Sequence, residues 1–188
     1  MRLLRIELKR LRSRRAVRWL TLLVFAGLGA LGTQGIYDAS RPGATDWVFV
    51  VRMDEASKMI AVLLSVYAFL VGATYAGADW AAGTVQSLLT WEPRRVRVIV
   101  AKVVALTVGV LLVGVLLHLV ITGIVTVAAD RGGNFDGIDG DFWRRQLLAD
   151  ARALGLGVAI GWVSFGIASL TRNTGVALGF GFVYFAIL

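Results

Sequence analysis

Residues that could perform chemistry are few in this chain of 188 residues. The densest group is acidic: Asp136, Asp139 and Asp141 stand close together, followed by Arg144 and Arg145. Closely spaced aspartates can bind calcium, but these lack the spacing and the closing glutamate of an EF-hand loop. We interpret the stretch as a solvated turn. It is also the one place where a lipid-modifying active site could be sought.

The only histidine, His118, falls deep inside an apolar run. An imidazole at that depth can relay protons or contact a substrate, or it can stay neutral and bond to a neighbouring helix. The neutral state is favoured, because we expect no carboxylate at the same depth. The predicted membrane spans also carry no charged residue near their centres, which argues against an ion-driven pump.

Catalytic and nucleotide-binding motifs are missing from the sequence. There is no cysteine, and no GxxxxGK[ST], HExxH or GxSxG pattern occurs. The GLGALG run at 27–32 matches a dinucleotide fingerprint in letters, but it lies within an apolar span with no preceding strand. We therefore expect no enzyme activity, bound cofactor or metal in this chain.

The elements that hold these residues are predicted to be membrane helices. The sequence is 57% hydrophobic with a mean hydropathy of +0.74, well above soluble proteins. Runs long enough to cross a bilayer, which takes about 20 residues, lie at 17–36, 59–78, 98–128 and 153–170. A fifth run, 175–188, is shorter, so we expect a fragment or a short relative of a longer protein. The fold class is an all-α integral membrane protein in a single domain.

Charge placement predicts the orientation. The formal net charge is +8, and the basic residues crowd the ends of the predicted spans, which indicates topology and not nucleic-acid binding. They concentrate before the first span, at 79–97 and at Arg172, whereas acidic residues outnumber them in 37–58 and 130–152. The positive-inside rule then places the N-terminus and 79–97 in the cytoplasm of a multi-pass plasma-membrane protein.

The first 16 residues predict an amphipathic helix. Leu4, Leu8 and Leu11 recur at helical spacing. A basic stripe lies beside them, consisting of Arg2, Arg5, Lys9 and Arg12. Such a helix is expected in the cytoplasmic interface, with its leucines in the acyl boundary and its arginines on anionic headgroups. The alternative is a topology signal without a further role.

Small residues predict where helices pack closely. Gly157 and Gly161, and again Gly175 and Gly179, have the small-xxx-small spacing of membrane helices in close contact. We expect helix contacts at both pairs, within one chain or between two.

The segment between the second and third spans is unusual in composition. Asp79 ends the apolar run, and Gly83 with Thr84 permits a turn and an N-cap. A short helix is then expected, with its apolar side formed by Val85, Leu88 and Leu89. Pro93 ends it, and two arginines, Arg94 and Arg95, anchor the next span. Two tryptophans flank it, Trp80 and Trp91; either they sit in the membrane interface or the segment docks on a cytoplasmic partner.

This segment resembles a known family. Asp79, Gly83-Thr84, the paired leucines, the proline with its arginines, and Lys102 are similar to the segment after the second membrane helix of ABC-2 type export permeases. The amphipathic N-terminus resembles the family's elbow helix, and the runs fit five of its usual six spans. Two features depart from the family: Asp stands where Glu is commoner, and the sixth helix with its re-entrant region is absent.

The resemblance implies a transmembrane subunit of an ATP-driven ABC exporter. It would form the translocation path with a second permease copy or paralogue, and a separate P-loop ATPase would bind ATP and Mg²⁺. The segment 80–91 would be the coupling helix that meets the ATPase. Two other classes remain: a membrane scaffold that recruits a cytoplasmic partner without transport, and a membrane-embedded lipid enzyme.

Overall fold

The computed structural model describes residues 2–41, 47–83 and 95–187. The described chain is helical, and its elements are α1 (Arg2–Ser13), α2 (Arg15–Ala39), α3 (Phe49–Ala81), α5 (Arg95–Gly132), α6 (Gly140–Thr171) and α7 (Thr174–Ile187). Residues 84–94, which include most of the predicted coupling helix at 80–91, lie outside the described residues. Beyond the helices, one isolated bridge joins Val48 to Asn134.

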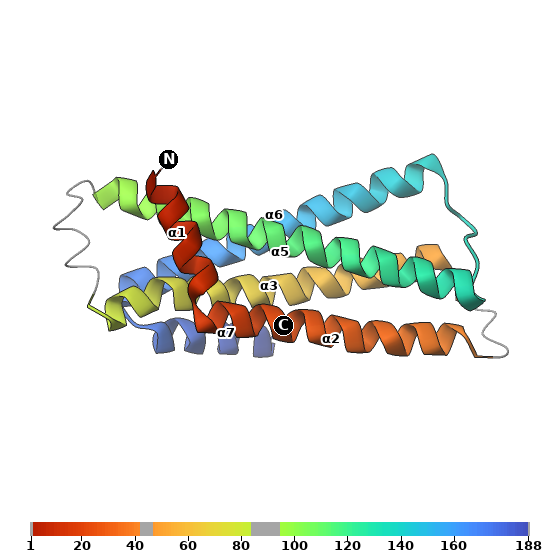
Figure 1. Ribbon diagram of the computed structural model, residues 1–188, viewed down its shortest axis with the longest axis horizontal. Coiled ribbons are helices and arrows are strands. Elements are labelled where there is room, and N and C mark those ends of the chain that lie inside the picture. Colours follow the sequence, from red (N-terminus) through yellow and green to blue (C-terminus); the bar gives the residue numbers. More distant parts are fainter. Residues whose placement is uncertain (1, 42–46, 84–94, 188) are drawn as a thin grey trace.

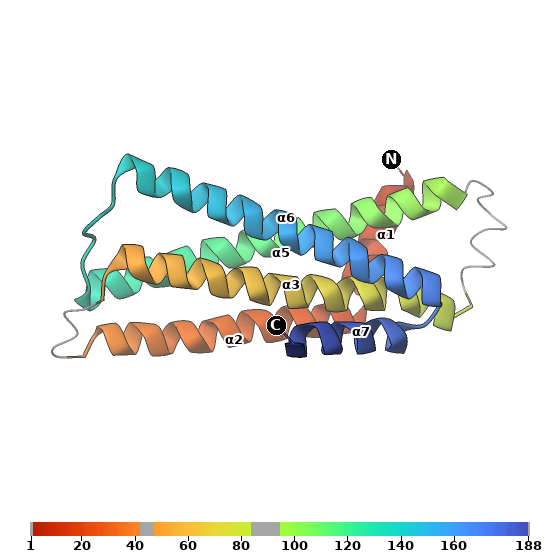
Figure 2. The same ribbon diagram turned by 180° about the vertical axis from the view of Figure 1, so that it is seen from behind.

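The four long helices form an elongated bundle with α3 inside it (Figures 1 and 2). α3 makes its most extensive contact with α6 and also meets α2, α5 and α7. Within α3, Ile60, Leu64, Ala68 and Tyr75 are completely buried. The central position of α3 means that a movement of this helix must be felt by every other long helix.

These four helices, α2, α3, α5 and α6, are long and apolar enough to cross a membrane. Each extends beyond its predicted span; α3 begins at Phe49 instead of residue 59, and α6 at Gly140 instead of 153. The fifth run forms α7, which is apolar but shorter than a span. Much of the stretches predicted as loops, 37–58 and 130–152, is therefore helical.

The N-terminal helix α1 lies steeply across α5 at one end of the bundle (Figure 1). Leu11 is buried in the protein core and its side chain fills the space beside Gly109 of α5. The expectation that the leucines of α1 enter the lipid boundary is therefore wrong for Leu11, because α5 offers a glycine groove that the leucine fills. Arg5, Lys9 and Arg12 are exposed, on the side of α1 away from this contact.

Small residues permit the close contact between α3 and α6. A Cβ on Gly72 of α3 would overlap the carbonyl oxygen of Gly161, and a Cβ on Gly157 would come within 2.9 Å of Leu64. Both Gly157 and Gly161 are buried. On α7, by contrast, Gly175 and Gly179 are exposed, and the buried small residues are Ala177 and Gly181.

The opposite end of the bundle is closed by aromatic side chains. The ring of Phe49, at the start of α3, lies 5.9 Å from Phe142 and 5.5 Å from Phe135. Backbone hydrogen bonds reinforce this closure: Asn134 donates to the carbonyl of Trp47 and Phe49 donates to that of Asn134. These contacts hold the connection between α5 and α6 against the start of α3.

Candidate functional site

A largely buried group of four charged residues and one tyrosine joins α1, α3 and α5 near the end of the bundle where α1 lies. We call Glu7, Arg14, Tyr75, Asp79 and Lys102 the charge cluster. Glu7 of α1 is 2% exposed, and its Oε2 accepts hydrogen bonds from the Tyr75 hydroxyl at 2.5 Å and from Lys102 Nζ at 3.0 Å. One carboxylate thus connects three helices.

The second carboxylate of the cluster is Asp79, near the end of α3. Its Oδ2 accepts from Lys102 Nζ at 2.6 Å, and its Oδ1 accepts from Arg14 Nη2 at 2.6 Å. Arg14, at the junction of α1 and α2, also donates to the carbonyl of Thr74 at 3.1 Å. The lysine therefore bridges both carboxylates, and the arginine ties the α1–α2 junction to α3.

Both carboxylates of the cluster are paired with cations, and Glu7 pairs in addition with Arg10 of its own helix at 3.2 Å. The two carboxylates of Glu7 and Asp79 face the cations of Lys102 and Arg14, which also lie 4.9 and 5.0 Å from the centre of the Tyr75 ring. Buried charges are tolerated when they are paired and hydrogen-bonded, and removing one partner is costly because the other stays buried. The cluster therefore favours one relative placement of α1, α3 and α5.

Its position in the chain connects the cluster to the predicted coupling segment. Asp79 precedes that segment and Lys102 follows it, so their ion pair joins the two helices between which the segment runs. Gly83, the last residue described before the gap at 84–94, has φ +64°, a left-handed conformation that suits glycine at a helix C-terminus. A force on the segment would reach α3 and α5 at paired residues.

Other predicted site residues lie around this end of α3. Trp80 is half-buried, and the guanidinium of Arg172 lies 4.9 Å from its ring centre. Arg172 adopts φ 54° in the turn between α6 and α7. Asp79 and Trp80 thus link the end of α3 to the α1–α2 junction and to the turn between α6 and α7. Of the remaining predicted partner-binding residues, Thr84, Val85, Leu88, Leu89, Trp91, Pro93 and Arg94 lie outside the described residues, and Arg95 begins α5.

The acidic stretch before α6 has a local structural role. Asp139 is the N-cap of α6, and its Oδ1 accepts the backbone N–H of Phe142 at 2.5 Å. Arg145 lies 3.7 Å from the same oxygen. Asp136, Asp139 and Asp141 are exposed. Across the described ranges, no group of three or more histidine, cysteine or acidic side chains is arranged to hold a metal ion.

His118 does have a carboxylate at its depth, so the prediction that no carboxylate lies there is wrong. Its Nε2 lies 3.4 Å from Oδ1 of Asp150. The prediction failed because α6 begins at Gly140, which makes the predicted loop around Asp150 part of a helix. The neighbouring polar side chains are Ser57 and Gln146, both buried.

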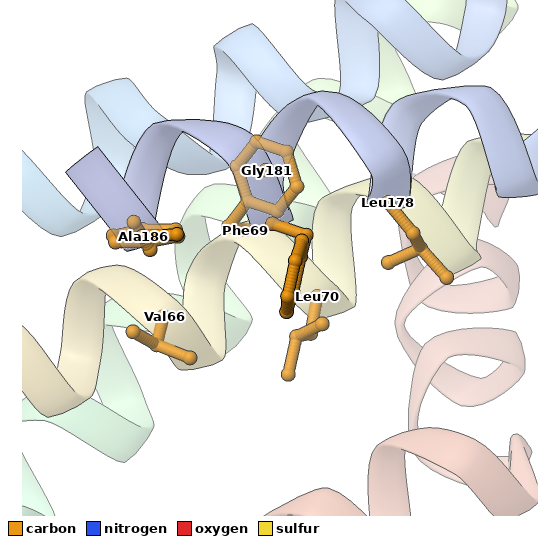
Figure 3. Close-up of a pocket in the computed structure, with 8 residues that line it drawn as sticks. Val66, Phe69, Leu70, Leu178, Gly181 and Ala186 are labelled. Carbon is orange, nitrogen blue, oxygen red and sulfur yellow. The ribbon is translucent and has the colours of Figure 1, made fainter.

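An open apolar pocket of about 490 Å³ lies between α3 and α7 (Figure 3). Val66, Phe69 and Leu70 come from α3, and α7 contributes Leu178, Gly181 and Ala186 among others. The Phe69 ring lies against Gly181, where a Cβ would overlap it. The named lining side chains offer no hydrogen-bonding group, so the pocket can accommodate an apolar chain but cannot orient a polar ligand.

Only two of the five members of the charge cluster were predicted from the sequence. Asp79 and Lys102 were singled out by the resemblance, whereas Glu7, Arg14 and Tyr75 were not. A signal for Glu7 was present, since a single carboxylate at helical spacing between Leu4, Leu8 and Leu11 falls on the apolar side of α1.

No protein-family model, curated protein or solved structure matches the chain significantly. The likeness to ABC-2 type permeases therefore stays a hypothesis.

Proposed function

We propose that this chain is the membrane subunit of an ATP-driven exporter of the ABC-2 type, inserted in the plasma membrane with its N-terminus in the cytoplasm. A separate ATPase binds ATP and Mg²⁺ and docks on the segment 80–91. A second permease copy or paralogue completes the translocation path. α7 then represents the fifth span of the family, and α1 its elbow helix.

The charge cluster is the observation that carries this proposal. A subunit driven by an external motor needs a rigid connection between the docking segment and the membrane helices. The Asp79–Lys102 pair, at 2.6 Å, joins the helices on both sides of that segment, and Glu7 adds α1 to the same group. Docking forces would then move α1, α3 and α5 together, because separating them would leave buried charges unpaired.

The class of molecule that is transported is inferred from the exposed surface of the bundle, which is weaker support than the charge cluster. Many large apolar side chains are exposed on α2, α5 and α6, among them Leu23, Leu119 and Val163. A path formed between two such surfaces suits an amphipathic or lipid-like molecule. A purified complex whose ATPase rate responds only to hydrophilic solutes would contradict this cargo class.

Co-purification from the native membrane tests the proposal. The wild-type chain should retain a P-loop ATPase in mild detergent, identified by mass spectrometry. Leu88→Asp should lose it, because a charge on the apolar side of the docking helix opposes burial in the partner. Ile138→Asp, at the opposite end of the bundle, is the matched control and should retain the ATPase at wild-type membrane levels.

A membrane scaffold is the competing function. The two functions differ in whether ATP binding to the partner moves the membrane helices. The chain contains no cysteine, so Ala82→Cys, at an exposed position, can carry one spin label per chain. In a transporter dimer the label-to-label distance should change between ATP-bound and nucleotide-free states. A bound partner with an unchanged distance would favour the scaffold.

A further inference from the structure

A second buried polar group lies in the half of the bundle opposite the charge cluster. It brings together Ser57 of α3, His118 of α5, and Gln146 and Asp150 of α6. His118 is 7% exposed and lies roughly 20 Å before the end of α5, at about 1.5 Å of rise per residue. Membrane proteins place ionisable groups at such depth at a cost, and usually for a function.

The hydrogen bonds of His118 identify its tautomer. Nδ1 lies 2.8 Å from the carbonyl oxygen of Gly114. A carbonyl only accepts hydrogen bonds, so Nδ1 carries a proton. Nε2 of a neutral ring then has a lone pair and no hydrogen. Among the described buried side-chain atoms, Nε2 is the one without a hydrogen-bond partner.

That lone pair faces another acceptor. Oδ1 of Asp150 lies 3.4 Å from Nε2, and an ionised carboxylate can only accept. The surrounding donors are already engaged: the Gln146 amide donates to Ser57 Oγ at 2.6 Å and to Asp150 Oδ1 at 2.8 Å, and Ser57 donates to the carbonyl of Met53 at 2.9 Å, with a longer contact of 3.5 Å to Asp150 Oδ1. Two acceptors facing each other repel, and one added proton converts the repulsion into a charge-assisted hydrogen bond.

No other charged group takes the place of that proton. Within the described part of the chain, His118 is the ion-pair partner of Asp150. The nearby charges of α3, Asp54 and Lys58, pair with each other at the surface. Of the other titratable side chains of the packed helices, those of the charge cluster lie toward the other end of α3 and α5, and the Tyr67 hydroxyl is hydrogen-bonded to Thr21. Arg95 is the first residue of α5. The rest lie on exposed faces or toward helix ends: Arg15, Arg18, Tyr37 and Asp38 on α2, Arg52 and Glu55 on α3, Arg97, Asp130 and Arg131 on α5, and Asp141, Arg144, Arg145 and Arg152 on α6.

We propose that one proton is held on Nε2 of His118 and hydrogen-bonded to Asp150, forming a largely buried proton site that fastens α5 to α6. With the proton on Nε2 the pair is neutral overall, and without it the bundle holds an uncompensated carboxylate. The low-dielectric interior favours the neutral state. The site is independent of the proposed transport function, since it rests on contacts distant from the docking segment.

The single histidine makes the test direct. Protein labelled with ¹⁵N-histidine gives ring signals from His118 alone, and ¹⁵N shifts distinguish protonated from unprotonated ring nitrogens. In lipid bilayers at neutral pH, both Nδ1 and Nε2 of the wild type should be protonated. An unprotonated Nε2 in the wild type would overturn the proposal, and no result from a variant could rescue it. A metal ion bound to Nε2 would give the same signal and would equally rule out a proton there.

Variants then establish the role of the carboxylate. Asp150→Asn keeps the size of the side chain but removes its charge, so the Nε2 proton should be lost at the same pH while the Nδ1 proton stays. Asp150→Glu restores a carboxylate and should restore the Nε2 proton. Asp54→Asn, at the surface of α3, is the matched control and should leave both ring signals unchanged. A protonated Nε2 in Asp150→Asn would show that Asp150 does not hold the proton.

Discussion

Glu7 is a carboxylate on the apolar side of α1, and the observed packing of α1 nevertheless depends on it. It lies among the leucines of α1, on the side that packs against the bundle, where a carboxylate is costly unless it is paired. Its partners outside α1, Tyr75 and Lys102, come from different helices. Arg10 of the same helix offsets part of the cost of burying Glu7, and the rest is offset only when α1, α3 and α5 all occupy their observed positions, which makes Glu7 a specificity determinant for the position of α1.

Replacing Glu7 by Gln should lower the free energy of unfolding by about 2 kcal/mol, because Lys102 then loses one of its two buried counter-charges. Unfolding of the purified protein in mixed micelles, titrated with a denaturing detergent, measures this loss. Glu55→Gln is the matched control: Glu55 pairs with Arg52 at the surface, and its loss should cost less than about 0.5 kcal/mol. Equal losses in both variants would show that Glu7 is no more important than a surface carboxylate.

The residues of both polar groups were only partly predictable from the sequence. Asp79 and Lys102 stood out because, on either side of an unusual segment, they resemble positions of the ABC-2 permease motif. Their pairing with Glu7 could not be predicted, since that contact joins residues far apart in the chain, and local patterns carry no information on such contacts. His118 stood out as a lone histidine, but its partner Asp150 was assigned to a loop because hydropathy reports only the apolar part of a helix.

At the scale of elements, the contact between α3 and α6 depends on glycine. Gly72→Ala should lower the free energy of unfolding by about 1–3 kcal/mol, because the added methyl group would overlap the Gly161 carbonyl and the Ser164 hydroxyl, and backbone cannot easily yield. Gly155→Ala is the matched control. A Cβ there meets nothing within 4 Å, and alanine is the better helix former by up to about 1 kcal/mol.

The same unfolding titration measures both glycine variants. A neutral or stabilising Gly72→Ala would show that α3 and α6 do not pack as closely as observed, whereas a destabilising Gly155→Ala would place a neighbour on the exposed side of α6, such as a second chain.

The N-terminus of α6 gives a further element-scale prediction. Asp139→Ala should cost about 1 kcal/mol, because the Phe142 N–H loses its capping acceptor at the helix start. Asp136→Ala, in the same acidic stretch but without a capping role, should change stability by less than about 0.5 kcal/mol. If both variants instead abolished an activity on a lipid substrate without loss of stability, the lipid-enzyme hypothesis would regain support.

The element boundaries show what sequence patterns miss. The centres of the four spanning helices were predicted, because an apolar run of sufficient length has few alternatives. The polar extension at 49–58 was not. It is stabilised as helix by local ion pairs, Arg52 with Glu55 and Lys58 with Asp54, and by burial of Phe49 and Met53. Hydropathy does not register ion pairs, so such extensions are assigned to loops.

At the scale of the whole molecule, charge is distributed along the long axis of the bundle. Figure 1 places α1, the start of α2 and the start of α5 at one end, and these elements carry the exposed Arg12, Arg18 and Arg97. The start of α6 lies at the other end, and the exposed Asp136 and Asp141 belong to this stretch of the chain. Each long helix runs between these ends, so the asymmetry predicted from loops is retained although those loops are partly helical. The positive-inside rule therefore still predicts that the α1 end faces the cytoplasm.

Cysteine accessibility tests that orientation, since the natural chain has no cysteine to interfere. Ala82→Cys and Asp136→Cys place exposed thiols at opposite ends of the bundle. In intact cells a membrane-impermeant maleimide should label Asp136→Cys within minutes and leave Ala82→Cys unlabelled until the membrane is permeabilised. The reverse pattern would invert the protein and place the docking segment outside the cell, away from ATP, which would rule out the exporter. The proton site at His118 would survive that result, because its contacts do not depend on which side of the membrane it faces.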